Sequence, residues 1–236
     1  CGLQCPGPIL RVKTALDGLQ AGQVVKVLST DAGFTKDIAG WCASVGHRLV
    51  SLTTEQKTHV AFIEKCAPPA TTAAAGAAPI SKNTTLVVFS GDYDKAMAAF
   101  IIANGAAATG AAVTMFFTFW GLNILRRPES VSVKKDVLER MFGWMMPRGA
   151  TRLGLSKMNM SGLGAAMIRF VMRRKRVAPL PELIASARQA GVKLVACTMS
   201  MDVMGIKREE LIDGLEEAGV ASYLHAAQQG TVNLFI

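Results

Sequence analysis

A stretch rich in alanine, proline and threonine, residues 66–82, divides the chain into two parts of unequal length. It has no aromatic residue and no hydrophobic periodicity, and it contains Pro68-Pro69, Gly76 and Pro79. A segment of this composition has no apolar face to pack on a core, so we expect it to be extended and mobile. The sequence therefore predicts a first domain over residues 1–65, a linker over 66–82 and a second domain over 83–236.

The first part has the pattern of a small α+β domain. Ile9, Val12, Leu16 and Leu19 recur at helical spacing, which predicts an amphipathic helix over 9–19. A second helix is predicted over 33–46, and apolar and β-branched runs predict strands over 23–29, 48–53 and 58–63. A two-layer α+β sandwich accommodates this order, with both helices on one face of the sheet.

The second part alternates apolar strands with helices. Strands are predicted over 85–90, 112–119, 192–196 and 231–236, and helices over 93–109, 180–190 and 208–218. Such alternation is typical of a three-layer α/β domain, in which a parallel sheet is covered on both faces. Residues 96–125 carry no charge and could span a bilayer. Asn104-Gly105 and Gly110 interrupt that stretch, so we favour a helix, a turn and a strand.

Cys5 stands in the sequence Cys5-Pro6-Gly7-Pro8, directly before the first predicted helix. Prolines suit a helix entrance, where their missing N–H would have been unpaired anyway. Unpaired amides and the helix dipole favour an anion there, and a thiol so placed falls from a pKa of about 8.5 to ~3.5–7.5. We therefore predict a reactive thiolate at Cys5, supported by Pro6, Gly7 and Pro8. The alternative is a structural cysteine beside a tight turn.

The same residues resemble the Cys-Pro-x-Pro signature of TusA/SirA-like sulfur carriers. The resemblance continues through Asp31-Ala32-Gly33-Phe34, Trp41-Cys42 and Gly46-His47, and covers residues 1–65. In that family the signature cysteine carries a persulfide, which implies this role for Cys5. The family has a strand before the motif, whereas this chain begins at Cys1. We therefore expect the chain to be the C-terminal fragment of a larger multidomain sulfurtransferase or disulfide reductase.

The second candidate site lies where predicted strands end. In a parallel α/β sheet, ligands bind outside the carboxyl ends of the strands. Gly91, Trp120-Gly121 and Cys197 follow or end three predicted strands, and Cys197 is the only cysteine of the second part. We predict a reactive sulfur at Cys197, with Gly91, Trp120 and Gly121 around it and amides of Thr198 and Met199 beside it. The alternative is a buried, inert cysteine.

The second part resembles the DsrE/DsrF/DsrH-like sulfurtransferases. The resemblance rests on residues 88–92, 115–121 and 195–205, and it covers 83–236. In that family the persulfide cysteine lies at this strand end, which implies the same role for Cys197. The resemblance also implies a homo-oligomer formed through the second domain.

The remaining cysteines carry weaker signals. Cys42 stands in a predicted helix beside Trp41 and is expected in the core, and Cys66 opens the linker. Cys1 is four residues from Cys5 and could pair with it. With His47 and His59 these cysteines lack the paired spacing of a zinc site, and we expect neither a metal nor an organic cofactor. The odd, scattered set of five is unlike a secreted disulfide framework and favours a cytoplasmic location.

The positive charge of the chain, net +9, is concentrated in one segment. Residues 126–176, called the basic segment below, hold thirteen lysines and arginines against three acidic residues, and also seven of the twelve methionines. A solvated helix over an ordinary core explains this composition. A docking surface for an acidic partner or a membrane surface is the alternative, and nucleic acid is disfavoured because interleaved aromatic residues are lacking.

The two cysteines and the flexible linker together predict sulfur trafficking. Sulfane sulfur would pass as a cysteine persulfide between Cys5, Cys197 and the thiols of donor and acceptor proteins. Whether the chain acts as an enzyme, a sulfurtransferase, or only as a persulfide carrier stays open. The competing hypothesis is a non-catalytic module that senses redox state, or that uses the basic segment to dock a partner protein or associate with a membrane.

Overall fold

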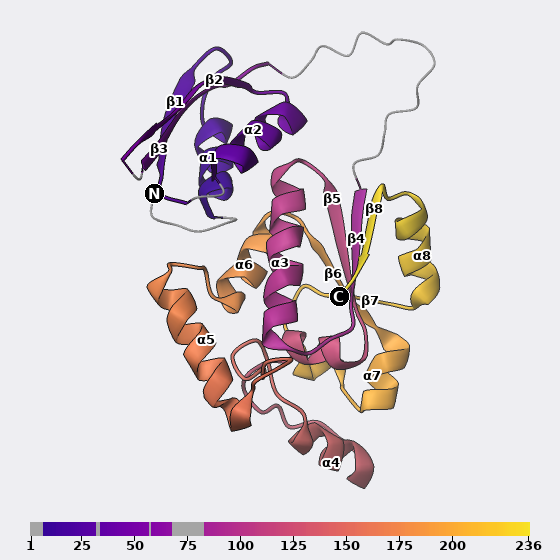
Figure 1. The fold of residues 1–236 in the computed structure, drawn as a ribbon. Coiled ribbons are helices and arrows are strands. Elements are labelled where there is room, and N and C mark those ends of the chain that lie inside the picture. The colour runs from indigo at the N-terminus through magenta and orange to yellow at the C-terminus, as the bar shows by residue number, and fades with distance from the viewer. Residues whose placement is uncertain (1–6, 32–33, 57, 68–82) are drawn as a thin grey trace. The chain divides into compact units, whose positions relative to one another are not determined.

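The computed structural model describes residues 7–31, 34–56, 58–67 and 83–236. These residues form two compact units, built mainly from α1 to β3 and from β4 to β8 (Figure 1). The first unit contains a three-stranded sheet and the second a five-stranded sheet. The fold class predicted from the sequence, a small α+β unit joined to a larger α/β unit, is confirmed.

The first unit has two helices and three antiparallel strands. In chain order these are α1 (Gly7–Asp17), β1 (Val24–Ser29), α2 (Phe34–Val45), β2 (Arg48–Glu55) and β3 (Thr58–Glu64). The strand order is β1-β3-β2, and β3 pairs antiparallel with both neighbours. All five elements correspond to predicted ones, with ends that differ by one or two residues.

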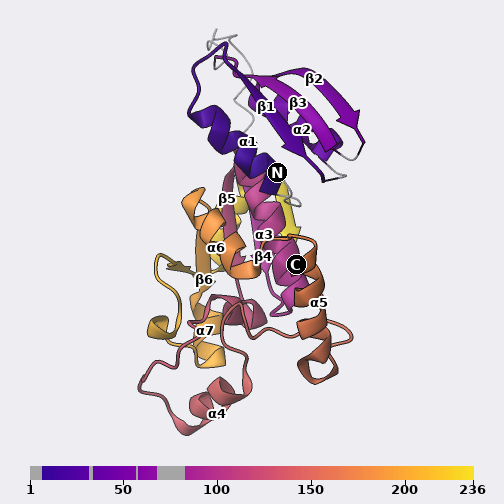
Figure 2. The same ribbon diagram turned by 90° about the vertical axis from the view of Figure 1, so that its left-hand side faces the viewer.

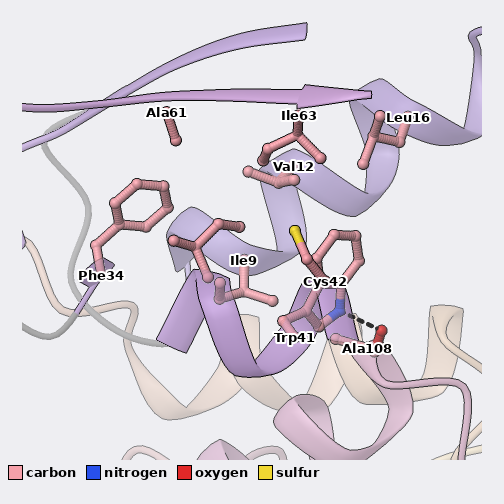
Figure 3. Packing of buried hydrophobic residues seen from close by; sticks show 10 residues of the cluster. Ile9, Val12, Leu16, Phe34, Trp41, Cys42, Ala61, Ile63 and Ala108 are labelled. Atoms are coloured by element: carbon pink, nitrogen blue, oxygen red, sulfur yellow. Dashed lines mark hydrogen bonds between the residues drawn. The ribbon is translucent and has the colours of Figure 1, made fainter. Parts of the chain in front are cut away.

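The core of the first unit lies between the two helices and the sheet (Figure 3). Helix α1 contributes Ile9, Val12 and Leu16, which recur every three or four residues and so share one face. Helix α2 and strand β3 supply the rest of this core, namely Phe34, Ile38, Trp41, Cys42, Ala61 and Ile63. The amphipathic spacing of the first helix therefore serves packing in the way the sequence predicts.

The second unit is built on a wholly parallel sheet. Its strands are β4 (Asn83–Val88), β5 (Ala112–Phe117), β6 (Lys193–Cys197), β7 (Glu216–Ala218) and β8 (Val232–Phe235). Their order is β7-β6-β5-β4-β8, and each adjacent pair is parallel. The helices are α3 (Tyr93–Ala108), α4 (Val137–Met145), α5 (Leu163–Arg174), α6 (Leu180–Gln189), α7 (Thr198–Met204) and α8 (Val220–Gln228).

Helices cover both faces of this sheet, with α3 and α6 on one side and α8 on the other (Figure 1). Two neighbouring residues of β5 mark the two faces. The ring of Phe117 lies 6.0 Å from that of Phe100 in α3, whereas the ring of Phe116 lies 5.3 Å from that of Tyr223 in α8. Because strand side chains alternate between faces, the residues in register with Phe116 also face α8.

The carboxyl ends of the strands meet a group of short elements, α7, α4 and the 3-10 helix η1 (Phe119–Leu125) (Figures 1 and 2). The uncharged stretch 96–125 forms most of α3, then β5 and η1, as the helix, turn and strand prediction requires. Among the described residues, no helix has both the length and the apolar character needed to cross a membrane.

The predicted helix over 208–218 is wrong. That stretch forms a short 3-10 helix, η3 (Arg208–Glu210), a turn, and strand β7. Gly214 takes a φ of +72°, which a right-handed helix does not allow. The amide of Ile212 instead donates to the carbonyl of Leu125, and Leu211 forms an antiparallel bridge with Arg126. Helices α7 and α8 were not predicted.

Candidate functional site

Cys5 and Pro6, half of the first predicted site, lie outside the described residues, as does Cys1. The described half is consistent with a helix entrance. Helix α1 begins at Gly7, and Pro8 is buried in its first turn. Proline is tolerated there because the first amides of a helix have no partner within it.

Cys197 is the last residue of β6 and the residue from which α7 starts. Strand β6 lies between β5 and β7 and is therefore an inner strand of the sheet. Cys197, its last residue, lies at the carboxyl ends of the strands, where parallel α/β sheets bind ligands. The backbone at Cys197 is extended and turns directly into the helix, without a connecting loop. The amides of Thr198 and Met199 therefore belong to the first turn of α7, and the Cys197 side chain makes no capping hydrogen bond to that turn.

The thiol of Cys197 is buried, with 4% of the residue exposed. Its side chain lies on the α8 face of the sheet, in a small cluster with Phe116 and Val195. Ala218 and Tyr223 pack against this cluster, and Tyr223 comes from α8. The cysteine that the sequence predicts as reactive is thus covered by aromatic and aliphatic side chains.

A cavity of about 380 Å³ lies next to this cover, between α8 and the sheet. Phe116, Val195, Ala218 and Tyr223 line it, and these are the residues that pack on Cys197. Its other walls include polar side chains, among them Thr85, Thr114 and His225. Cys197 itself does not line the cavity, which extends toward the amino ends of the strands at Asn83, Ala112 and Lys193.

A hydrogen bond fixes the first turn of α7. The hydroxyl oxygens of Thr118, which follows β5, and Ser200 lie 2.7 Å apart. Ser200 is fully buried, whereas the neighbouring Thr198 and Met199 are exposed. The turn that follows Cys197 is therefore tied to the end of the adjacent strand.

The glycines predicted around Cys197 serve close backbone packing between the segments that follow β4 and β5. A Cβ atom at Gly91 would lie 2.7 Å from the carbonyl oxygen of Trp120, and one at Gly121 would collide with the carbonyl oxygen of Val88. The amide of Gly121 donates to the carbonyl of Phe89. The structure thus brings Gly91, Trp120 and Gly121 together, and the ring of Trp120 is about half exposed.

The other described cysteines differ in environment, and Cys42, Cys66 and Cys197 are all free thiols. Burial, with a smaller contribution from Cys66, raises the pKa of Cys42 to about 11. Cys42 is therefore protonated at neutral pH and belongs to the core. In the described part of the chain, no three His, Cys, Asp or Glu side chains are grouped closely enough to hold a metal.

Sequence reasoning missed the residue that covers Cys197 and the hydrogen bond that holds the turn after it. Tyr223 lies on a helix that was not predicted, and the partners Thr118 and Ser200 are 82 positions apart in the chain. The sequence does indicate that Phe116 and Val195 are buried, because each lies in an apolar run that predicts a strand. Their shared face follows only from the register Phe116 to Val195, which the sequence does not specify.

The chain matches known families over nearly its whole length. Residues 80–235 match the DsrE/DsrF/DrsH-like family, and residues 1–65 match the family described as Sulfurtransferase TusA. Over 156 residues the chain is 60% identical to the uncharacterized protein YrkE of Bacillus subtilis (strain 168), covering 66% of this chain and 98% of that protein.

Two further matches involve the larger part of the chain. It is 35% identical over 159 residues to the sulfur carrier protein DsrE2 of Allochromatium vinosum, covering 66% of this chain and 98% of that protein. Among solved structures, the ychN protein from E. coli aligns with a TM-score of 0.38 and 10% sequence identity, over 65% of this chain and 99% of that one.

Proposed function

The chain belongs to the DsrE/DsrF/DrsH-like family and carries a TusA domain over residues 1–65, and from this we propose that it passes sulfane sulfur between protein thiols as a cysteine persulfide. Its general role is sulfur trafficking, the activity that the sulfur carrier and sulfurtransferase matches support. Cys5 and Cys197 are the proposed carriers, one in each part of the chain.

The transfer step is a thiolate attack on a persulfide. The acceptor thiol loses its proton, and its sulfur forms a bond to the terminal sulfur of the donor persulfide. The bond between that terminal sulfur and the donor cysteine breaks, and the donor leaves as a thiolate that takes up a proton. One sulfur atom changes place and the total oxidation state is unchanged, so the step needs no external oxidant or reductant.

The position of Cys197 is the observation that carries the proposal. It is the last residue of an inner strand, at the sheet edge where parallel α/β proteins bind ligands. The first turn of α7, whose first amides have no partner within the helix, starts directly after it.

We further propose that the second unit assembles with copies of itself and acts with donor and acceptor proteins. Aromatic side chains at the carboxyl ends of β4 and β8 support an interface there. The rings of Phe89 and Phe235 stack at 5.8 Å, and both are exposed. Free thiols fit a reducing compartment such as the cytoplasm.

Labile sulfur bound to the protein tests the proposal. The chain is incubated with a small-molecule persulfide, freed of donor, and treated with cyanide, which releases sulfane sulfur as thiocyanate. We expect stoichiometric thiocyanate from the wild type and from Cys42→Ser, which removes a core thiol. We expect almost none from Cys5→Ser/Cys197→Ser, and a double variant that releases as much as the wild type contradicts the proposal.

A second candidate function is docking to an acidic partner or a membrane surface, without sulfur transfer. Helix α4 favours it, because its apolar side chains Val137, Leu138, Trp144 and Met145 are exposed within the basic segment. Exposed apolar residues among positive charges suit an anionic surface. Co-sedimentation with anionic vesicles that high salt reverses, in a chain that takes up no labile sulfur, would favour this function.

A further inference from the structure

The basic segment forms most of the lining of a second cavity, of about 730 Å³, which is open to solvent. Its walls come from residues 130–133, from α4, from residues 146–148 and from Glu210 in η3. The charged side chains that line it are Lys135, Arg140, Arg148, Arg152 and Glu210. Four cations thus face a space that contains a single carboxylate.

That carboxylate is already fully engaged. Glu210 is 1% exposed, and its oxygens lie 2.5 Å from Lys135 Nζ, 3.3 Å from Arg148 Nη2 and 3.4 Å from Arg126 Nη2. It also accepts a hydrogen bond from the amide of Lys207. One negative charge therefore balances three buried or partly buried cations, and Arg140 and Arg152 add two more that it does not touch.

Several donors around the cavity have capacity left. Arg148 Nη1 is buried without a hydrogen-bond partner in the described part of the chain. Arg140 donates to the carbonyl of Lys135, and the Arg152 side chain has no ion-pair partner among the described residues. Buried polar groups are normally paired, so the unpaired guanidinium nitrogen of Arg148 and the four cations along the cavity favour an anionic ligand there.

The shape and chemistry of the walls define the class of that anion. Guanidinium groups bind phosphate through two parallel hydrogen bonds, and several together suit a group with more than one negative charge. Trp144, Val131 and Val133 add an apolar side to the same cavity. We propose that this cavity binds a diphosphate group, held by Arg140, Arg148, Arg152 and Lys135.

This proposal does not depend on the proposed sulfur transfer, because the residues that would hold the anion are arginines and a lysine, not cysteines. A purely structural ion cluster is the competing explanation. It accounts for the contacts of Glu210 with Arg126, Lys135 and Arg148. It does not account for Arg140 and Arg152, which line the same cavity without contacting that carboxylate.

Isothermal titration calorimetry of the full chain provides the test, with inorganic pyrophosphate and ADP as separate probes at about 0.15 M salt, where exposed charges are screened. We expect saturable binding of at least one probe. ADP binding clearly tighter than pyrophosphate would identify an organic diphosphate, and equal binding would identify the diphosphate group alone. Both results support the proposal.

The variant Arg140→Gln/Arg152→Gln removes two exposed guanidinium groups without touching the buried cluster. We expect the affinity of this variant for the probe that binds the wild type to fall by at least ~10-fold, because the loss of one charged hydrogen bond costs about that much. The control Arg173→Gln removes one charge of the same segment, outside the cavity lining, and should bind like the wild type. Absence of binding to the wild type, or an equal loss in the control, would overturn the proposal.

Discussion

The hydroxyl groups of Thr118 and Ser200 share a hydrogen bond of 2.7 Å between the end of β5 and the first turn of α7. Ser200 is three residues beyond Cys197, within the helix that starts at that cysteine. The bond therefore holds the amides of this turn in place relative to the neighbouring strand. It connects the packing of the sheet with the surroundings of the proposed sulfur carrier.

Removing either hydroxyl tests this relationship. Thr118→Val leaves the buried hydroxyl of Ser200 without this partner, which costs about 1–3 kcal/mol of unfolding free energy. Ser200→Ala leaves the hydroxyl of Thr118, which is partly exposed and can bond to water, so we expect a loss of only about 0.5–1.5 kcal/mol. Urea unfolding followed by circular dichroism measures both, and a larger loss for Ser200→Ala would contradict this assignment.

Tyr223 should control access to Cys197. Its ring packs on Phe116 and on the cluster that contains the cysteine. Tyr223→Ala removes this aromatic contact and so destabilises the conformation in which Cys197 is covered, by ~1.4 kcal/mol. We therefore expect iodoacetamide to alkylate Cys197 about tenfold faster in this variant. Peptide mapping of time points gives the rate. The matched control is Leu224→Ala, on an exposed neighbour in α8, and equal rates in both variants would show that Tyr223 is not the cover.

Cys42 should be inert in the folded protein. A pKa of about 11 leaves on the order of 100-fold less thiolate at neutral pH than a free cysteine has. We expect alkylation of Cys42 at pH 7 to be at least ~100-fold slower in the native chain than in the chain unfolded in urea. A native rate close to the unfolded one would mean that the core of the first unit opens readily.

The carboxylate of Glu210 should make stability depend on pH. Burial acts to raise its pKa, but hydrogen bonds from Lys135 and from the amide of Lys207, with the charges of Lys135 and Arg126, outweigh burial and lower the pKa below 4.5. In the acidic range the unfolded chain therefore binds the proton more readily than the folded chain, and stability rises with pH there. The contribution of Glu210 is complete above its ordinary pKa and is lost as pH falls through the lowered value.

Glu210→Gln measures this contribution. We expect the variant to lose about 3–5 kcal/mol of unfolding free energy at pH 7, because three cations keep no carboxylate partner. The difference between wild type and variant should shrink as pH falls below 4.5. A difference that stays constant from pH 7 to pH 3 would exclude an ionised Glu210 as its source.

Much of the fold could be predicted because its strongest elements carry local signals. Helix α1 has a clear apolar face, and strands β4 and β5 are apolar runs. The prediction failed at residues 208–218, which were expected to form a helix. There the tertiary contact of Ile212 with Leu125 and the positive φ of Gly214 decide the backbone. Short helices such as α7 and α8 have too few residues for a reliable periodic signal.

The candidate site could be predicted only in outline. The position of Cys197 follows from the end of an apolar strand, which the sequence shows directly. Its burial does not, because the cover depends on strand register and on Tyr223, 26 positions further along the chain. The charged cavity was likewise visible only as a segment of excess charge. The pairing of Glu210 with residues 62 to 84 positions away is a tertiary property.

The most direct test of the central claim is intact-mass spectrometry after incubation with a persulfide donor. It compares the wild type with Cys5→Ser, Cys197→Ser and the control Cys42→Ser. We expect the wild type and the control to gain the mass of two sulfur atoms, removable by a reducing agent, and each of the other variants to gain one. A wild type without labile sulfur, or adducts that neither Cys5→Ser nor Cys197→Ser diminishes, would contradict persulfide transport by these two cysteines.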